Sequence, residues 1–232
     1  MANIPRELKN KVSIIIPCKE IDGQSWYCIK NCEYLPNNKE IIVVDDKACP
    51  GFPATKRNWA MERATGNILA FIDSDAYPQE DWLDKALIHL QYHAAVCGPG
   101  ILPPDSSLWE KAADLVYRWL PYSYRVAPKS PRVVAEFPSF NLIVWKDKAP
   151  KFKPYLTGED SLFCREINGS IFYSPDIIVY HQRRPLFKPF WKQVATYGKH
   201  RGHLIRLALL GWISGIIVYG FNFVRGFFRR KI

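Results

Sequence analysis

Asp73 and Asp75 are the residues whose type and spacing most directly suggest chemistry. They follow a continuous apolar run at residues 68–72, which is too short for a typical helix and suits a buried strand. Ligands of open α/β sheets bind beyond the carboxyl ends of the strands, so this pair would lie at a binding edge. Carboxylates without a nearby His or Cys favour a hard cation, and Mg²⁺ is commonly held by one or two carboxylates together with substrate phosphates. The alternative is a solvated turn, in which Asp-Ser-Asp is also common.

A second acidic pair follows another predicted strand. Asp45 and Asp46 end an apolar run at residues 40–44, and an earlier run at residues 12–16 stops at Pro17. Residues 53–64 lie between the second and third runs and predict a helix with a basic first turn. A strand, a helix and a strand in this order form a βαβ unit, whose right-handed crossover gives a parallel sheet. We therefore expect an α/β fold with a mostly parallel sheet flanked by helices.

The rest of the chain predicts elements around this sheet. We expect a helix at 78–89, a pair of strands at 133–143, a helix from 158 to 167, and a strand-like segment at 170–180 that Pro175 interrupts. Residues 99–135 are less regular, and we interpret them as a helix or a mobile loop beside the site.

Charge divides the chain unevenly. The net charge is +10, yet residues 1–180 contain 21 Lys and Arg against 22 Asp and Glu, whereas residues 181–232 contain 11 Lys and Arg and no acid. Because this basic segment is also apolar and aromatic, it favours an anionic membrane surface over a nucleic acid as its partner. We expect a domain at 1–182 and membrane-associated helices at 183–232.

The basic segment contains two candidate membrane helices. Apolar residues recur at helical spacing beside lysines from 185 to 199, which is typical of a helix in the headgroup region. Residues 207–224 carry no charge, and a helix of that length is just long enough to span a bilayer. A spanning helix, an interfacial helix and a core helix of the domain all remain open.

The six cysteines are scattered, and the N-terminus shows no signal peptide. Free, mostly buried thiols in a reducing cytoplasm are expected. The protein would then lie on the cytoplasmic face of the cell membrane.

Five motifs in order resemble the family 2 glycosyltransferases of the GT-A fold. They are Val-Ser-Ile-Ile-Ile-Pro, Glu-Ile-Ile-Val-Val-Asp-Asp, Lys-Arg-Asn before a helix, Ile-Leu-Ala-Phe-Ile-Asp-Ser-Asp and Gly-Glu-Asp. The resemblance runs from about residue 12 to residue 181. It implies inverting transfer of a sugar from a nucleotide-sugar donor, with Mn²⁺ or Mg²⁺ bridging the diphosphate.

The resemblance also implies roles for individual residues. Asp73 and Asp75 would hold the metal, with His181 close to the metal or the diphosphate. Asp160, beside Glu159, would be the general base for inversion. Asp45 or Asp46 would hold the base or the ribose of the donor, and Arg183 and Arg184 would clamp its phosphates. In all, the residues expected to contact the donor are Pro17, Lys19, Glu20, Asp45, Asp46, Lys56, Arg57, Ser74, Arg183 and Arg184.

Some features depart from this family. Lys47-Ala48-Cys49-Pro50-Gly51 replaces the usual small polar turn after the second acidic pair, and the Gln-x-x-Arg-Trp of processive synthases is missing. The missing motif predicts transfer of a single sugar. The basic, aromatic tail predicts a lipid-linked or glycan acceptor near the membrane, in glycan or cell-envelope synthesis. A nucleotidyltransferase, or a catalytically silent scaffold of the same fold at a membrane, remains the alternative, and a nucleic-acid binder is the least favoured.

Overall fold

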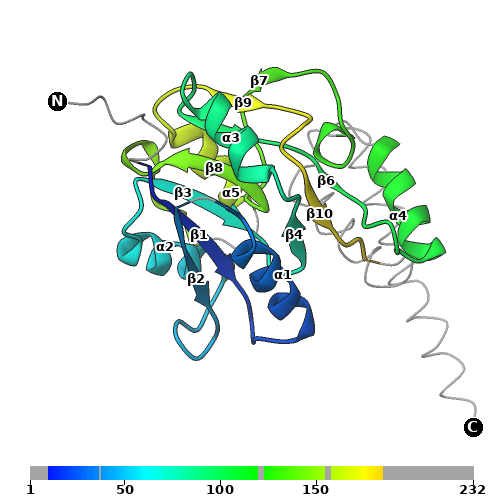
Figure 1. The fold of residues 1–232 in the computed structure, drawn as a ribbon, viewed down its shortest axis with the longest axis horizontal. Coiled ribbons are helices and arrows are strands. Elements are labelled where there is room, and N and C mark those ends of the chain that lie inside the picture. Colours follow the sequence, from blue (N-terminus) through cyan, green and yellow to red (C-terminus); the bar gives the residue numbers. More distant parts are fainter. Residues whose placement is uncertain (1–9, 37, 120–122, 155–157, 185–232) are drawn as a thin grey trace, which may run out of the picture. The chain divides into compact units, whose positions relative to one another are not determined.

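The computed structural model describes residues 10–36, 38–119, 123–154 and 158–184. Figure 1 shows these residues as the strands of a seven-stranded and a three-stranded sheet, together with helices. The chain divides into two compact units, one made of Met1–Ile101 and Ala127–His181, the other of Leu102–Val126 and Gln182–Ile232. The predicted helices at 185–199 and 207–224 lie outside the described residues and stay predictions, as does the predicted domain boundary after residue 182.

The main sheet of the first unit has seven strands in the order β2-β1-β3-β8-β5-β9-β7. Their bounds are Val12–Pro17 (β1), Lys39–Val44 (β2), Ile68–Ile72 (β3), Ala95–Cys97 (β5), Arg132–Val134 (β7), Asn141–Trp145 (β8) and Ile171–Tyr173 (β9). β1 pairs in parallel with β2 and β3, but β8 runs antiparallel to β3 and β5. β1, β2, β3, β5 and β9 run in one direction and β7 and β8 in the other. The prediction of a mostly parallel sheet is thus confirmed only in part, because apolar runs predict burial and not strand direction, and the sheet is mixed.

Helices cover both faces of this sheet. On one face α1 (Gly23–Glu33) and α3 (Trp82–Leu90) pack against alternate residues of β1 and β3, such as Ile14 and Ala70. On the other face Phe71 of β3 lies 5.7 Å, between ring centroids, from Phe163 of α5 (Glu159–Glu166). α2 (Pro53–Arg63) connects β2 to β3 and packs against β1 and β2. The helix expected at 78–89 begins later, at Trp82, because residues 76–78 form a strand.

A second, three-stranded sheet begins where β3 ends, next to the predicted site. Its order is β4 (Ala76–Pro78), β10 (Val179–His181) and β6 (Gly100–Ile101). β4 follows directly after Asp75, and His181 of β10 pairs with Ala76. The small sheet therefore brings the late histidine to the end of β3, which no local pattern in the sequence predicts.

The second unit contains α4 (Leu108–Trp119) and a short 3₁₀ turn, Ser123–Arg125. Ser107 and Glu110 exchange hydrogen bonds in a capping box before the first turn of α4. The interpretation of this region as a helix is thus confirmed for residues 108–119. No helix in the described part of the chain is long and apolar enough to cross a membrane.

Candidate functional site

Arg57 brings together two of the predicted acidic motifs. Its Nη2 donates to Asp73 Oδ1 at 2.9 Å, and its Nη1 lies 3.6 Å from Glu159 Oε1 and 3.8 Å from Asp160 Oδ1. Only 4% of the Arg57 side chain is exposed. Its Nε and Nη1 are buried without a hydrogen-bond partner in the described structure, as is Asp160 Oδ1. Arg57 was predicted to approach the nucleotide, and the structure shows it holding the carboxylates of two distant segments in one cluster.

Asp73, Asp75 and His181 form a group that could hold a divalent cation. One ligand atom from each lies within 4.8 Å of the others, and His181 Nε2 is 3.4 Å from Asp75 Oδ1. Two carboxylates and one imidazole form a donor set that fits Mn²⁺ and also accepts Mg²⁺. The predicted metal residues are therefore brought together, although they come from β3's end and from β10.

Close packing fixes the position of the histidine. The ring of Phe140 lies 4.9 Å from the ring of His181, and Gly100 of β6 lies beside both. A Cβ atom added at Gly100 would lie 2.7 Å from Phe140 Cε2 and 3.1 Å from His181 Cβ. Only glycine leaves room for this arrangement.

Electrostatics in the cluster favour protonation of one acid. Burial, followed by the charge of Asp160, raises the pKa of Glu159 to about 7, against the opposing effect of Arg57. Burial also raises the pKa of Asp73, with Arg57 lowering it and Asp75 raising it. Gly158, whose φ of 85° lies in the left-handed region, precedes these acids at the start of α5. The helix N-terminus thus delivers both acids to Arg57.

Lys56 joins the ends of β1 and β2. Its buried ammonium forms an ion pair with Asp46 and donates to the carbonyl oxygen of Cys18 at 2.6 Å. Asp46 is partly exposed, at 43% of its side chain. Lys56 was predicted to bind the donor, and the structure shows that it orients Asp46, which remains available to a ligand.

The remaining donor residues lie at the same strand ends. Pro17 closes β1 in the core, whereas Lys19 and Glu20 are exposed in the loop that follows. Asp45 accepts a hydrogen bond from the backbone N–H of Ala48 at 2.9 Å and caps the turn after β2. Ser74 lies half-buried between the two metal-site aspartates.

Arg183 and Arg184 differ in their surroundings. Arg183 Nε donates to Asp114 Oδ1 at 3.0 Å, and both side chains are 5% exposed. A guanidinium buried against its own carboxylate is not presented to a phosphate, so the predicted clamp role of Arg183 is not supported by this geometry. Arg184 is exposed and keeps that prediction.

Asn141 is a buried polar residue that sequence reasoning missed. It pairs with Ile72, directly before Asp73, and its Oδ1 accepts from Trp82 Nε1 at 2.8 Å. Its Nδ2 donates to the carbonyl oxygens of Gly98 and Ile177 at 2.8 and 2.7 Å. A single Asn at the start of a strand carries no pattern that would have identified this role.

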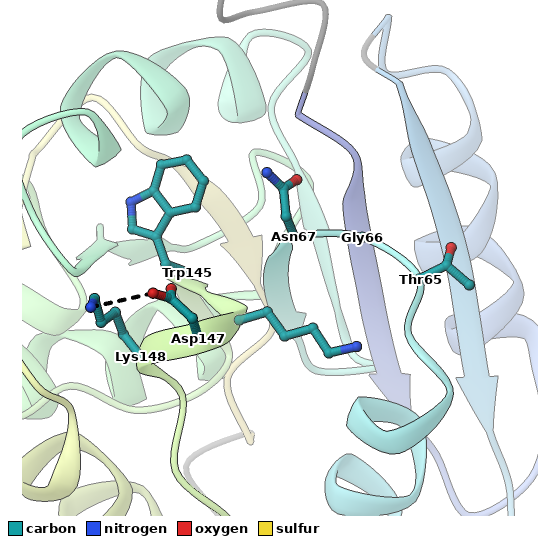
Figure 2. Close-up of a pocket in the computed structure, with 7 residues that line it drawn as sticks. Thr65, Gly66, Asn67, Trp145, Asp147 and Lys148 are labelled. Carbon is teal, nitrogen blue, oxygen red and sulfur yellow. Dashed lines mark ion pairs between the residues drawn. The ribbon is translucent and has the colours of Figure 1, made fainter.

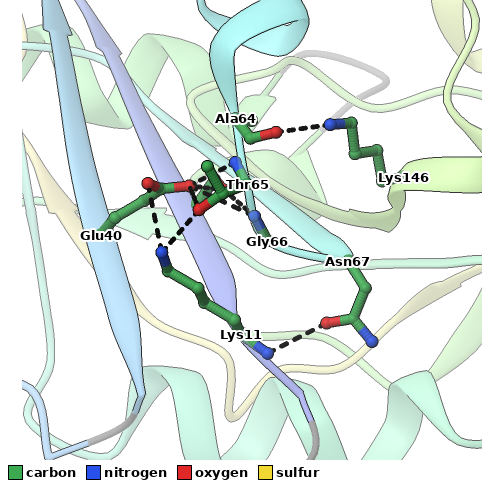
Figure 3. Close-up of polar contacts among 8 residues, drawn as sticks. Lys11, Glu40, Ala64, Thr65, Gly66, Asn67 and Lys146 are labelled. Carbon is green, nitrogen blue, oxygen red and sulfur yellow. Dashed lines mark hydrogen bonds and ion pairs between the residues drawn. The ribbon is translucent and has the colours of Figure 1, made fainter.

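An open depression lies at the other end of β3. Figure 2 shows Asn67, Trp145 and Lys148 lining it, with Asp147 paired to Lys148 at 3.3 Å. Beside it, Glu40 accepts hydrogen bonds from Thr65 and Gly66 and pairs with Lys11 at 3.4 Å (Figure 3). Asn67 and Trp145 of this depression hydrogen-bond to neighbouring protein groups, and Asp147 pairs with Lys148, so we assign the chemistry to the acids around Arg57.

Comparison with known proteins points to one family. Residues 50–149 match the family model named Glycosyl transferase family 2. The Pre-mycofactocin glycosyltransferase of Mycobacterium tuberculosis is 25% identical over 194 residues, which is 77% of this chain. The chain spans only 40% of the length of that relative.

Solved structures share the fold. S. aureus TarS 1–349, in complex with UDP-GlcNAc, has a TM-score of 0.55 at 15% identity over 89% of this chain and 72% of that one. The mannosyltransferase PcManGT from Pyrobaculum calidifontis, in complex with GDP-Man and Mn²⁺, has a TM-score of 0.56 at 18% identity over 85% of this chain and 64% of that one. At these identities the likeness establishes the fold.

Proposed function

This chain carries a family 2 glycosyltransferase domain of the GT-A fold, and from that premise we propose that it is a metal-dependent inverting glycosyltransferase that uses a nucleotide-sugar donor. The observation that carries the proposal is the single Arg57 side chain, which holds Asp73 of the metal group together with Glu159 and Asp160. The bound ligands of the structural relatives, UDP-GlcNAc in one and GDP-Man with Mn²⁺ in the other, support a nucleotide-sugar and a divalent cation here.

In this proposal the chain's residues divide the work. Asp73, Asp75 and His181 would hold the cation, which would supply positive charge to stabilise a departing diphosphate. Asp160 takes the proton of the acceptor hydroxyl as that oxygen attacks the anomeric carbon from the face opposite the leaving group. Arg57 Nη1, 3.8 Å from Asp160 Oδ1, keeps this carboxylate in place, and the Asp160 side chain is 23% exposed.

Turnover and donor binding test the proposal separately. Asp160→Asn is expected to lower kcat by about 10²- to 10⁴-fold while donor binding is retained. Asp147→Asn, at an aspartate that is 70% exposed, is the matched control and should leave turnover unchanged. Turnover that survives Asp160→Asn would refute the assigned base.

Donor binding is measured by thermal shift with uridine and guanosine diphosphates and their sugars, with and without Mn²⁺. Stabilisation that requires both nucleotide and metal, and that Asp75→Ala removes, would support the metal-bound donor. If no nucleotide stabilises the protein, the silent scaffold of the same fold becomes the better reading. Release of pyrophosphate from a nucleoside triphosphate would instead support a nucleotidyltransferase.

The acceptor and the location are also proposals. We propose single-sugar transfer to a lipid-linked acceptor at the cytoplasmic face of the cell membrane, because the segment from 181 to 232 has 11 cationic residues and no acid. Cell fractionation without detergent tests this, since a fully soluble protein would contradict it.

A further inference from the structure

α4 presents an apolar surface away from its buried side. Leu108 and Leu115 are 81% and 68% exposed, and Trp119 is 54% exposed. Their spacing of seven and four residues places them on one face of the helix. Trp109, 53% exposed, lies at the edge of this face in the first turn. An exposed patch of large apolar side chains is typical of a surface that binds another protein, a membrane or a ligand.

The opposite side of α4 shows which side chains face inward. Ala113 is fully buried and Asp114 is 3% exposed. Asp114 is neutralised twice, by Arg183 Nε at 3.0 Å and by Arg118 Nε at 2.6 Å. The helix is therefore anchored on one side by a buried ion pair, and its exposed residues Leu108, Leu115 and Trp119 on the other side include no acid.

We define the α4 face as Leu108, Trp109, Leu115 and Trp119, and we propose that it docks on an anionic lipid bilayer with its side chains in the headgroup region. Lys111 and Arg118, both exposed, border it at helical spacing on one margin. Tryptophan at both ends and cations along one edge are the composition of a helix that lies in a membrane interface.

The choice of a bilayer over another occupant rests on charge. α4 belongs to the same compact unit as residues 182–232, which carry eleven Lys and Arg residues and no acid. Such a unit complements an anionic surface, and a second copy of the same unit would add like charge to like charge. The proposal concerns binding and does not depend on the transfer reaction.

Vesicle sedimentation of the full chain, without donor or metal, tests the proposal. Wild type should bind vesicles of phosphatidylcholine mixed with phosphatidylglycerol and bind phosphatidylcholine alone more weakly. Leu115→Glu should weaken binding about ten-fold or more, because it removes an apolar anchor and adds a repelled charge. Tyr92→Glu, at a residue of the first unit that is 78% exposed, is the matched control. Equal melting temperatures would show that both variants fold.

A fluorescent label separates α4 from the rest of the basic unit. The six native cysteines are all buried, so Leu115→Cys can be labelled selectively with an environment-sensitive dye, with Tyr92→Cys as control. We expect a blue shift on anionic vesicles at position 115 and none at position 92. Sedimentation without a shift at 115 would overturn the proposal by showing that another segment binds. A label already in apolar surroundings without vesicles would overturn it in favour of a protein cover, and absence of binding would refute it outright.

Discussion

Replacing Glu159 by glutamine is expected to stabilise the apo fold at about pH 8 and to change its stability little at about pH 4.5. Burial and the neighbouring Asp160 make the ionised form of Glu159 unfavourable, so its pKa is raised from 4.5 to about 7. Glutamine has a similar shape and remains neutral at every pH. The substitution therefore removes an electrostatic penalty that the folded protein carries only when Glu159 is charged.

The sign follows from proton binding in the two states. Between pH 4.5 and about 7 the folded protein keeps a proton on Glu159 that the unfolded chain has lost, so rising pH favours unfolding. Each pH unit in this interval corresponds to about 1.4 kcal/mol, which gives a loss of about 3 kcal/mol across it. The variant does not suffer this loss, and its advantage should be complete above about pH 7 and decline as the pH falls toward 4.5.

Urea unfolding of wild type and Glu159→Gln over this pH range, with a chelator present, measures the difference directly. Glu80→Gln, at an exposed glutamate outside the Arg57 cluster, is the control for the substitution itself. A variant that is less stable than wild type at pH 8 would refute the reasoning, because it would mean that Arg57 outweighs burial and Asp160. A gain that does not change with pH would show a packing effect instead.

Three further substitutions test the opposite end of the sheet, the strand beside Asp73 and the packing of His181. Glu40→Gln should destabilise the fold by about 3 kcal/mol at neutral pH, because the hydrogen bonds that Glu40 accepts outweigh burial and lower its pKa to about 2; in urea titrations this difference should disappear as the pH falls from 4.5 toward 2. Asn141→Leu should lower the free energy of unfolding by about 3 kcal/mol or more, since it leaves Trp82 Nε1 and buried carbonyls unpaired; a neutral result in denaturant melts would contradict that. Gly100→Ala should weaken Mn²⁺ binding, read by calorimetry, about ten-fold by displacing His181, and unchanged affinity would show that the ring adapts.

The parts of the fold that sequence predicted are those with a local signal. Apolar runs of strand length predicted β1, β2 and β3, of which β2 and β3 are followed by acids, and the structure places the carboxyl ends of these parallel strands together. The helix at 53–64 and the acidic start of the helix at 158 were also predicted, because the preferences of Pro, Gly and capping residues act over a few residues. All six cysteines are buried free thiols, as predicted.

What could not be predicted depends on contacts between distant residues. The apolar sequence of β8 does not indicate the direction in which the strand runs. Its antiparallel position between β3 and β5 is set by the route of the chain after residue 101. The family resemblance assigned Arg57 to the nucleotide, but no local pattern shows that its partners in the structure are acids 16 and about 100 positions away. Arg183 looked like a phosphate clamp until its burial against Asp114 was seen.

Glu40 and Glu159 show how the two edges of the same sheet differ. Glu40, at the edge where β2 begins, accepts hydrogen bonds from Ser13, Thr65 and Gly66, and its ionised form is stabilised. Glu159, beside the edge where β3 ends, is buried next to another carboxylate, and its ionised form is destabilised. Natural proteins tolerate such unfavourable electrostatics mainly where function requires it. Glu40→Gln is expected to lower the free energy of unfolding and Glu159→Gln to raise it. These opposite changes would therefore identify the functional end of the sheet by stability measurements alone, without a substrate.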